Sequence, residues 1–274
     1  MTSLGPERRT VFSVWRRRGV ISCTVLLAAC AARAPVRPTG TATPDPTAIE
    51  AFTQATKQCA GLKTVSAEIR LSGRAGAEKI RGTLHAGLTA PAAVRFEAVA
   101  PFGPPVFILA GRDNRATLLL PRDNRVLRDA DVAQLLERLT GLALGADDIR
   151  LILTGCLADR ATPADGRSWP KGWRAVTVGP GITAYLADRN GAPVVVAGDH
   201  GAWRVDYANH QNGFPRSVRI RSGPSGEVDL TAALEQLEIN TDIDEKAFAI
   251  EVPSGAISIT LDDLRAVAPL RGSN

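Results

Sequence analysis

The side chains of this sequence that could do acid–base or metal chemistry are few and widely spaced. Its three histidines are His85, His200 and His210. Only the neighbours Asp199 and His200 could be proposed as a catalytic dyad, and both lie in a turn-like "GDHG" stretch where polar residues are ordinary. No HExxH, GxSxG, phosphate-loop or paired-cysteine metal motif occurs. The sequence therefore predicts a protein that is not an enzyme and has neither a cofactor nor a metal site.

Two pairs of adjacent aspartates are the next candidates for chemistry. Asp147–Asp148 and Asp262–Asp263 each stand at the start of an expected helix. A carboxylate in the first turn interacts favourably with the helix dipole. Their position therefore accounts for both pairs without a catalytic role.

The N-terminal cysteines belong to a segment unlike the rest of the chain. A basic stretch is followed by an apolar run of 11 residues, 19–29, which includes Cys23. Such a run is too short to span a bilayer as a helix but suits a signal peptide. Leu27–Ala29 and then Cys30 resemble a bacterial lipobox. The resemblance implies that the leader, residues 1–29, is removed and that Cys30 carries the lipid.

Cys59 and Cys156 are the two cysteines left for the folded part of an exported protein. In an oxidising compartment, a disulfide between them is the simplest pairing. It would close a long loop and stabilise the fold by roughly 4 kcal/mol. The alternative is two buried free thiols.

The charge of the chain comes mainly from its leader. The full sequence has 33 basic and 28 acidic residues and a net charge of +5. Residues 1–29 hold five Arg and one Glu, so the rest has 28 basic and 27 acidic residues and a net charge of +1. A nearly neutral domain gives no case for nucleic-acid binding.

The remaining chain reads as a tether followed by one domain. Residues 30–46 are rich in Pro, Thr and Ala, which predicts a lipid-anchored flexible tether. From residue 47, a short helical stretch precedes strands such as "TVSAEIRLS" (64–72) and "KIRGTLHAGL" (79–88), in which apolar and polar residues alternate. Residues 161–172 are expected to be a loop. We assign 47–274 to a single domain whose last part is a C-terminal extension.

A helical interlude divides the strands into two series. In "DADVAQLLERLTG" (129–141), leucines recur at helical spacing between acidic residues at the start and Gly141 at the end. The predicted fold is α+β, a large curled antiparallel sheet or half-open barrel with helices covering its concave face. Its interior is either a packed core or an apolar cavity. Alternation along the strands and helical spacing indicate six residues that line this interior: Val65, Ile69, Leu84, Phe96, Leu135 and Leu139.

One turn places an aromatic residue where water would meet it. "VAPFGPPVF" (99–107) sets Phe102 between Pro101 and Gly103, with apolar strands on both sides. The pattern leaves two alternatives: Phe102 folds back onto the sheet as a plug, or it projects from the turn.

"RFEAVAPFGPPVFILAG" (95–111) and "DADVAQLLERLTGLALGADDIRLILTGC" (129–156) together resemble the LolB family of outer-membrane lipoproteins. The resemblance covers roughly residues 47–230. It implies a half-open barrel whose cavity takes the acyl chains of lipoproteins delivered by a LolA-like periplasmic carrier. It also implies that the loop of Pro101, Phe102 and Gly103 contacts the membrane. The C-terminal extension and the two cysteines depart from the family pattern.

The first hypothesis is therefore an outer-membrane lipoprotein, facing the periplasm as a monomer, that accepts acylated lipoproteins and helps to insert them. The residue after Cys30 is Ala31 and not Asp, which under the best-known sorting rule implies the outer membrane. A lipid- or glycolipid-binding or envelope-stress-sensing lipoprotein on the same scaffold is the second hypothesis. A structural envelope lipoprotein with a filled core is the third.

Overall fold

One open sheet organises the part of the chain that the computed structural model describes, residues 36–157, 162–201, 203–222 and 227–267, all of which fall within one unit, Ala32–Asn274. The sheet has 15 strands within these described residues. They are β1 (Thr43–Pro44), β2 (Thr64–Ala75), β3 (Glu78–Thr89), β4 (Ala93–Val99), β5 (Phe107–Arg112), β6 (Arg115–Leu120), β7 (Arg125–Asp131), β8 (Ala164–Trp169), β9 (Trp173–Gly179), β10 (Ile182–Arg189), β11 (Ala192–His200), β12 (Trp203–Ala208), β13 (Ser217–Ser222), β14 (Val228–Ile239) and β15 (Ile257–Ser258).

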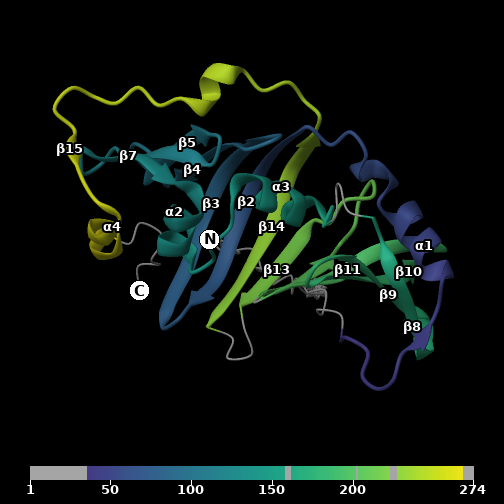
Figure 1. The fold of residues 1–274 in the computed structure, drawn as a ribbon. Helices are drawn as coiled ribbons and strands as arrows, with labels where there is room; N and C mark the ends of the chain where they lie inside the picture. The colour runs from purple at the N-terminus through teal and green to yellow at the C-terminus, as the bar shows by residue number, and fades with distance from the viewer. Residues whose placement is uncertain (1–35, 158–161, 202, 223–226, 268–274) are drawn as a thin grey trace, which may run out of the picture. The chain divides into compact units, whose positions relative to one another are not determined.

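The spatial order of the strands joins the two series that the sequence separates. It runs β1-β8-β9-β10-β11-β12-β13-β14-β2-β3-β4-β5-β6-β7-β15, so β14 pairs with β2 in the middle of the sheet. Every pairing is antiparallel except that of β15 with β7, which is parallel. In Figure 1 the strands β8–β11 run across the direction of β2 and β3. The sheet is not closed, because β1 and β15 remain as edge strands.

Alternation along the strands gives the sheet one apolar face. Ile69 of β2 lies opposite Leu84 of β3 and opposite Leu234 of β14, and all three side chains are buried. Their neighbours in sequence, such as Glu68 and Arg70, point to the other face. The buried residues of the apolar face and of the helices form one continuous core.

The helices are α1 (Thr47–Ala55), α2 (Val132–Thr140), α3 (Ala146–Thr154) and α4 (Leu261–Val267), with 3₁₀ turns η1 (Lys57–Cys59), η2 (Pro170–Gly172) and η3 (Glu245–Phe248). The start and the end of α2 agree with the sequence. The Asp131 carboxylate accepts a hydrogen bond of 3.0 Å from the Gln134 amide, and Gly141 ends the helix at φ 79°. The predicted fold class, a large antiparallel sheet with helices over its apolar face, is confirmed.

The prediction of a loop at 161–172 is wrong in its central part. Residues Ala164–Trp169 form β8, which pairs with β9 on one side and with β1 on the other. Its sequence "ADGRSW" has no apolar alternation because none of its residues is fully buried. Backbone hydrogen bonding near the sheet edge therefore forms this strand, and hydrophobic periodicity cannot reveal it.

Part of the segment expected as a tether contacts the sheet. The Arg37 guanidinium pairs with the Asp199 carboxylate and donates hydrogen bonds to the carbonyl oxygens of Gly198 (2.9 Å) and Val205 (3.2 Å). A few residues later Thr43–Pro44 pairs with β8 as β1. The leader 1–29 and Cys30 lie outside the described residues.

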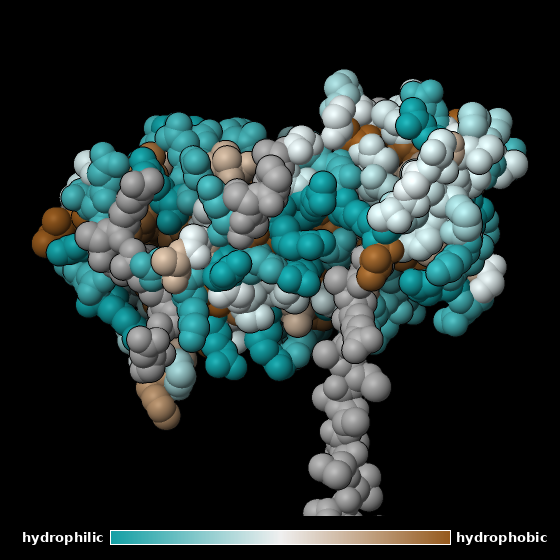
Figure 2. All heavy atoms as spheres, turned by 90° about the horizontal axis from the view of Figure 1, so that it is seen from below, coloured by the Kyte–Doolittle hydropathy of each residue, from teal (hydrophilic) through white to brown (hydrophobic). Residues whose placement is uncertain are grey.

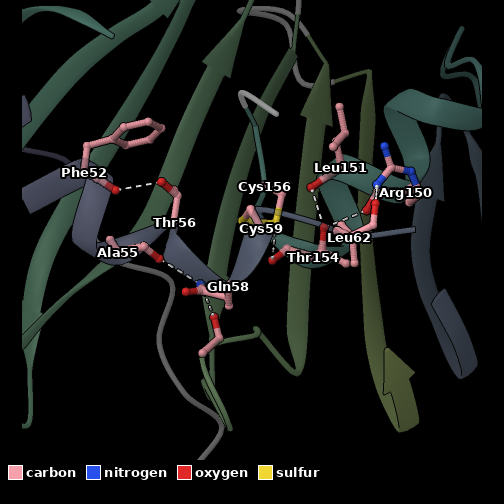
Figure 3. Close-up of a disulfide and its surroundings, with 11 residues drawn as sticks. Phe52, Ala55, Thr56, Gln58, Cys59, Leu62, Arg150, Leu151, Thr154 and Cys156 are labelled. Carbon is pink, nitrogen blue, oxygen red and sulfur yellow. Dashed lines mark hydrogen bonds between the residues drawn. A yellow bond between two sulfur atoms is a disulfide. The ribbon is translucent and has the colours of Figure 1, made fainter. Parts of the chain in front are cut away.

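A disulfide ties α3 to the connection between α1 and β2. Cys59 and Cys156 are bonded, as the sequence predicts, with their Cα atoms 5.6 Å apart (Figure 3). Arg150 of α3 reinforces this link, because its Nη1 donates a hydrogen bond of 2.8 Å to the Leu62 carbonyl. Helix α3 is thus held at two points, through Arg150 and through Cys156 just after its end, to the segment that precedes β2.

The C-terminal extension runs from one face of the sheet to the helices on the other. It first lies over the polar face of β4, where Arg95 donates to the Ala247 carbonyl at 3.0 Å. It then adds β15 to the edge of β7 and ends in α4, which packs on α2 through the buried Leu264 (Figure 1). An ion pair of 3.3 Å joins Arg138 of α2 to Asp262 of α4. Among the helices of the described residues, none is long and apolar enough to cross a membrane.

Candidate functional site

An apolar cavity of about 100 Å³ lies between α2, α3 and the apolar face of the sheet. Thr140 alone among its lining residues has a polar side chain, and its hydroxyl donates a hydrogen bond of 2.8 Å to the Leu136 carbonyl. The wall of the cavity therefore offers no unpaired polar side chain that could bind a polar ligand. The lining residues are Ile69, Leu71, Leu84, Phe96, Phe107, Leu109, Leu136, Leu139, Thr140, Leu142, Leu144, Ile149, Leu153, Ile220, Leu230 and Ala232.

Four of the six proposed lining residues stand at this cavity. Ile69, Leu84, Phe96 and Leu139 line it, from three strands and one helix. Val65 and Leu135 do not; both are completely buried in the core around it. Alternation and helical spacing identify which residues lie on the apolar face. They do not show where on that face the surrounding side chains leave space for a cavity.

The linker between α2 and α3 contributes wall residues that strand alternation and helical spacing do not indicate. Leu142 and Leu144 flank the turn and face the cavity. Gly141, which starts this linker, has no room for a side chain, since a Cβ there would lie 2.7 Å from a Val228 methyl group. The linker sequence "GLALG" has leucine at every second position, which is the signal that could have identified it.

The cavity is small compared with known ligand pockets. Pockets for small molecules usually measure about 300–1,000 Å³, whereas this cavity measures about 100 Å³. A long hydrocarbon chain fits only if α2, α3 and their linker move away from the sheet. Two contacts described above oppose such a movement: the disulfide at the end of α3 and the packing of α4 on α2.

The loop between β4 and β5 projects Phe102 into solvent. Its side chain is 89% exposed, and its neighbours Pro101 and Gly103 are exposed as well. The sequence left two alternatives for Phe102, packing back onto the sheet or projecting from the turn, and in the structure it projects. Gly103 adopts φ 78°, a left-handed conformation that favours glycine. Arg122, from the turn between β6 and β7, donates hydrogen bonds to the carbonyl oxygens of Phe102 and Pro104.

Large exposed apolar side chains are rare elsewhere in the described residues. Besides Phe102 they are Val36, Val99 and Ile257. Figure 2 shows one face of the molecule, on which hydrophobic residues form small separate patches among hydrophilic ones. Isolated exposed apolar residues are ordinary. Phe102 differs because it is an aromatic side chain, almost fully exposed, on a loop fixed by side-chain hydrogen bonds.

The residues considered for acid–base chemistry have structural partners. Asp199 pairs with Arg37 and accepts a hydrogen bond of 3.0 Å from the Tyr185 hydroxyl, so it does not orient His200. The His200 ring instead stacks on Trp203, with ring centroids 4.4 Å apart. His210 has a lowered pKa because its ring is buried, and it contacts the Val195 carbonyl at 3.0 Å.

The aspartate pairs act at helix starts, as expected. Asp148 accepts a hydrogen bond of 3.0 Å from the Gly145 amide at the start of α3, and Asp147 pairs with Arg150. At α4, the carboxylate of Asp263 accepts hydrogen bonds from Thr260, which hold its pKa below the usual value. Within the described ranges, no group of three or more His, Cys, Asp or Glu residues could hold a metal ion.

No protein-family model matches the sequence, and no curated protein sequence matches it. Several solved structures are similar to the chain. A LolA superfamily protein from Nitrosomonas europaea has 11% identity and a TM-score of 0.47, over 76% of this chain and 98% of that one. A lipoprotein-sorting protein domain from Vibrio parahaemolyticus has 11% identity and a TM-score of 0.45, over 73% of this chain and 95% of that one.

A DUF1329 family protein from Desulfovibrio piger is similar to the same extent, with 11% identity and a TM-score of 0.43 over 75% of this chain and 97% of that one. All three TM-scores are below 0.5. These similarities therefore carry no argument about function, which has to come from the residues of this chain.

Proposed function

We propose that the protein is an outer-membrane lipoprotein that accepts acylated lipoproteins in its apolar cavity and helps to insert them into the membrane. It is anchored through an acylated Cys30 after removal of residues 1–29, faces the periplasm and acts as a monomer. Its partner is a LolA-like periplasmic carrier. The transfer is non-covalent and needs no catalytic residue.

The apolar wall between α2, α3 and the sheet is the observation that carries this proposal. Burial of hydrocarbon is worth about 0.8 kcal/mol per CH₂ group, so an acyl chain leaves one binding site only for another of comparable apolarity. The wall offers such an environment once the helices move apart. Exchange between a carrier, this cavity and a bilayer then requires little net change in free energy.

Phe102 supports the last step of the transfer. An aromatic side chain at the tip of a fixed loop suits contact with the interfacial region of a bilayer. The lipid at Cys30 would keep the domain at that surface. In this proposal the loop of Pro101, Phe102 and Gly103 meets the membrane while a client acyl chain leaves the cavity.

Depletion of the protein from its host tests the proposal. We expect acylated lipoproteins to accumulate on the carrier or in the inner membrane, measured by fractionation and immunoblotting. Correct sorting of all lipoproteins after depletion would contradict it. Native mass spectrometry of detergent-free protein tests the second hypothesis, since a co-purified lipid or glycolipid together with normal sorting would favour a lipid-binding role.

A further inference from the structure

A second concavity lies on the opposite, polar face of the same sheet. It measures about 640 Å³ and crosses five neighbouring strands, β12, β13, β14, β2 and β3. Its side chains alternate with core residues; Thr231, for example, stands between the buried Leu230 and Ala232 of β14. We call this concavity the polar groove. It is separate from the apolar cavity and has the opposite chemistry.

The two carboxylates of the polar groove are already neutralised. Asp229 accepts two hydrogen bonds from Arg219, of 2.7 and 2.6 Å, and this guanidinium lowers the pKa of Asp229. Asp206 is only 3% exposed and pairs with Arg221 and, at 3.5 Å, with Arg37. The acidic residues therefore do not make the polar groove a cation site.

Three cations of the polar groove have no ion pair or hydrogen bond within the described residues. Arg74, Lys79 and Arg81 are all exposed and come from the hairpin of β2 and β3. Arg74 lies directly opposite Lys79 in the strand register, and Arg81 lies opposite Ser72. Like charges directly opposite each other destabilise a strand pair. Asp229 of β14 lies opposite Arg74 on the other side, but its carboxylate is bonded by Arg219. A bound anion would reduce the repulsion that remains.

Hydroxyl groups accompany these cations. Ser72, Ser217 and Thr231 line the polar groove, and their side chains form no hydrogen bond in the part of the chain that the structure describes. A volume of about 640 Å³ is within the usual range for small-molecule sites. Unpaired cations favour a phosphate group, and free hydroxyls favour further hydroxyls on the ligand.

We propose that the polar groove binds a phosphorylated polyol, with Arg74, Lys79 and Arg81 at its phosphate and the serine and threonine hydroxyls at its hydroxyl groups. The phosphate could belong to a free sugar phosphate or to a phospholipid headgroup. The second source is within reach if the lipid anchor of the proposed function holds, because the chain from Cys30 to Arg37, beside Asp206, spans at most about 25 Å.

Calorimetric titration of the full-length protein in non-ionic detergent tests this site. Glucose 1-phosphate represents the free source, and glycerophosphoglycerol represents the deacylated headgroup. Glucose and inorganic phosphate are the reference probes. We expect at least one phosphorylated polyol to bind more tightly than both references, and the tighter of the two identifies the source.

The variant that removes the three charges is Arg74→Gln/Lys79→Gln/Arg81→Gln, and Arg70→Gln is its matched control. Arg70 points to the same face of β2 but pairs with Glu235 outside the polar groove. The triple variant should lose about tenfold or more in affinity while the control keeps it.

The inference is overturned if neither phosphorylated polyol binds, if inorganic phosphate or glucose binds equally well, or if the triple variant retains the affinity while its circular dichroism spectrum is unchanged. An unfolded triple variant is replaced by the three single variants, each of which should weaken binding. Filling the apolar cavity by Ala232→Leu should leave this titration unchanged. A failed acyl transfer and a failed polyol site are therefore distinguishable.

Discussion

Arg122 donates a hydrogen bond of 2.8 Å from Nη2 to the carbonyl oxygen of Phe102, and a second, of 3.2 Å from Nε, to that of Pro104. These bonds fix the backbone of the loop but leave the Phe102 ring, which is 89% exposed, without packing. The chain thus holds an apolar side chain in water on a stiff support. Such an arrangement suits a surface that meets another apolar phase.

The first prediction is that Phe102→Glu impairs transfer of acylated clients to vesicles without unfolding the protein. The substitution removes no packing, so the free energy of unfolding should change by no more than about 0.5 kcal/mol. A charge at the loop tip is costly at a bilayer interface, so we expect loss of most transfer activity. Transfer of a fluorescent acylated client to vesicles measures the activity, and urea unfolding measures stability.

The matched control is Val36→Glu, which introduces the same charge at an apolar side chain that is 85% exposed. It should transfer as the wild type does. Equal transfer by Phe102→Glu and the wild type would exclude a membrane role for the loop. Loss of stability in Phe102→Glu would show that the ring packs on the domain.

The second prediction concerns the apolar cavity. Ala232 lines it from β14, whereas the next residue, Ala233, points to the polar face. Ala232→Leu should fill most of the space and weaken uptake of a fluorescent fatty acid by about tenfold or more, with a stability change within about 1–3 kcal/mol. Ala233→Leu adds the same volume outside the cavity and should bind normally. Equal uptake by both variants would place the acyl site elsewhere.

Local patterns predict much of this fold, and long-range contacts account for the rest. The alternation of Val65, Ala67 and Ile69 correctly predicts β2 and its buried face, because one side of the sheet is covered. Leucine spacing, Asp131 and Gly141 correctly predict α2. These elements carry their own signal since burial repeats with the period of the backbone.

The elements that were missed depend on partners far away in the sequence. The strand β15 at Ile257–Ser258 exists because β7 offers an open edge. Likewise the sequence leaves two alternatives for Phe102, and the loop that carries it is hydrogen-bonded to Arg122, 20 residues away. The cavity is a space left between side chains of several elements, so no single segment encodes it. The polar groove also arises only when five strands come together.

The third prediction concerns the disulfide. Cys59 and Cys156 are 97 residues apart, so their bond removes much freedom from the unfolded chain. The double variant Cys59→Ser/Cys156→Ser should lose about 4–5 kcal/mol of unfolding free energy in the chain-entropy model. Urea unfolding measures this loss. Reductant should lower the midpoint of the wild type and leave the double variant unchanged; the same midpoint for both proteins without reductant would contradict the prediction.

The fourth prediction is a loss of stability at mildly acidic pH through His210. Burial, and secondarily the charge of Arg189, lowers its pKa below the ordinary value of 6.5, although the hydrogen bond to the Val195 carbonyl acts in the opposite direction. The fold therefore prefers the neutral ring. Above pH 6.5 the ring is neutral in both states and its contribution to stability is complete. As the pH falls below 6.5, the unfolded chain takes up the proton first, and this contribution is lost.

Urea unfolding between pH 7.5 and 5.5 measures this effect, which is at most about 1.4 kcal/mol per pH unit for one proton. His210→Gln should unfold with a smaller pH dependence than the wild type, because it cannot take up a proton in either state. The control is His85→Gln, at an exposed position on the polar face of β3, which should keep the wild-type dependence. The variant cannot take up a proton at position 210. If the free energy of unfolding falls equally in His210→Gln and in the wild type over this range, another group therefore causes the loss.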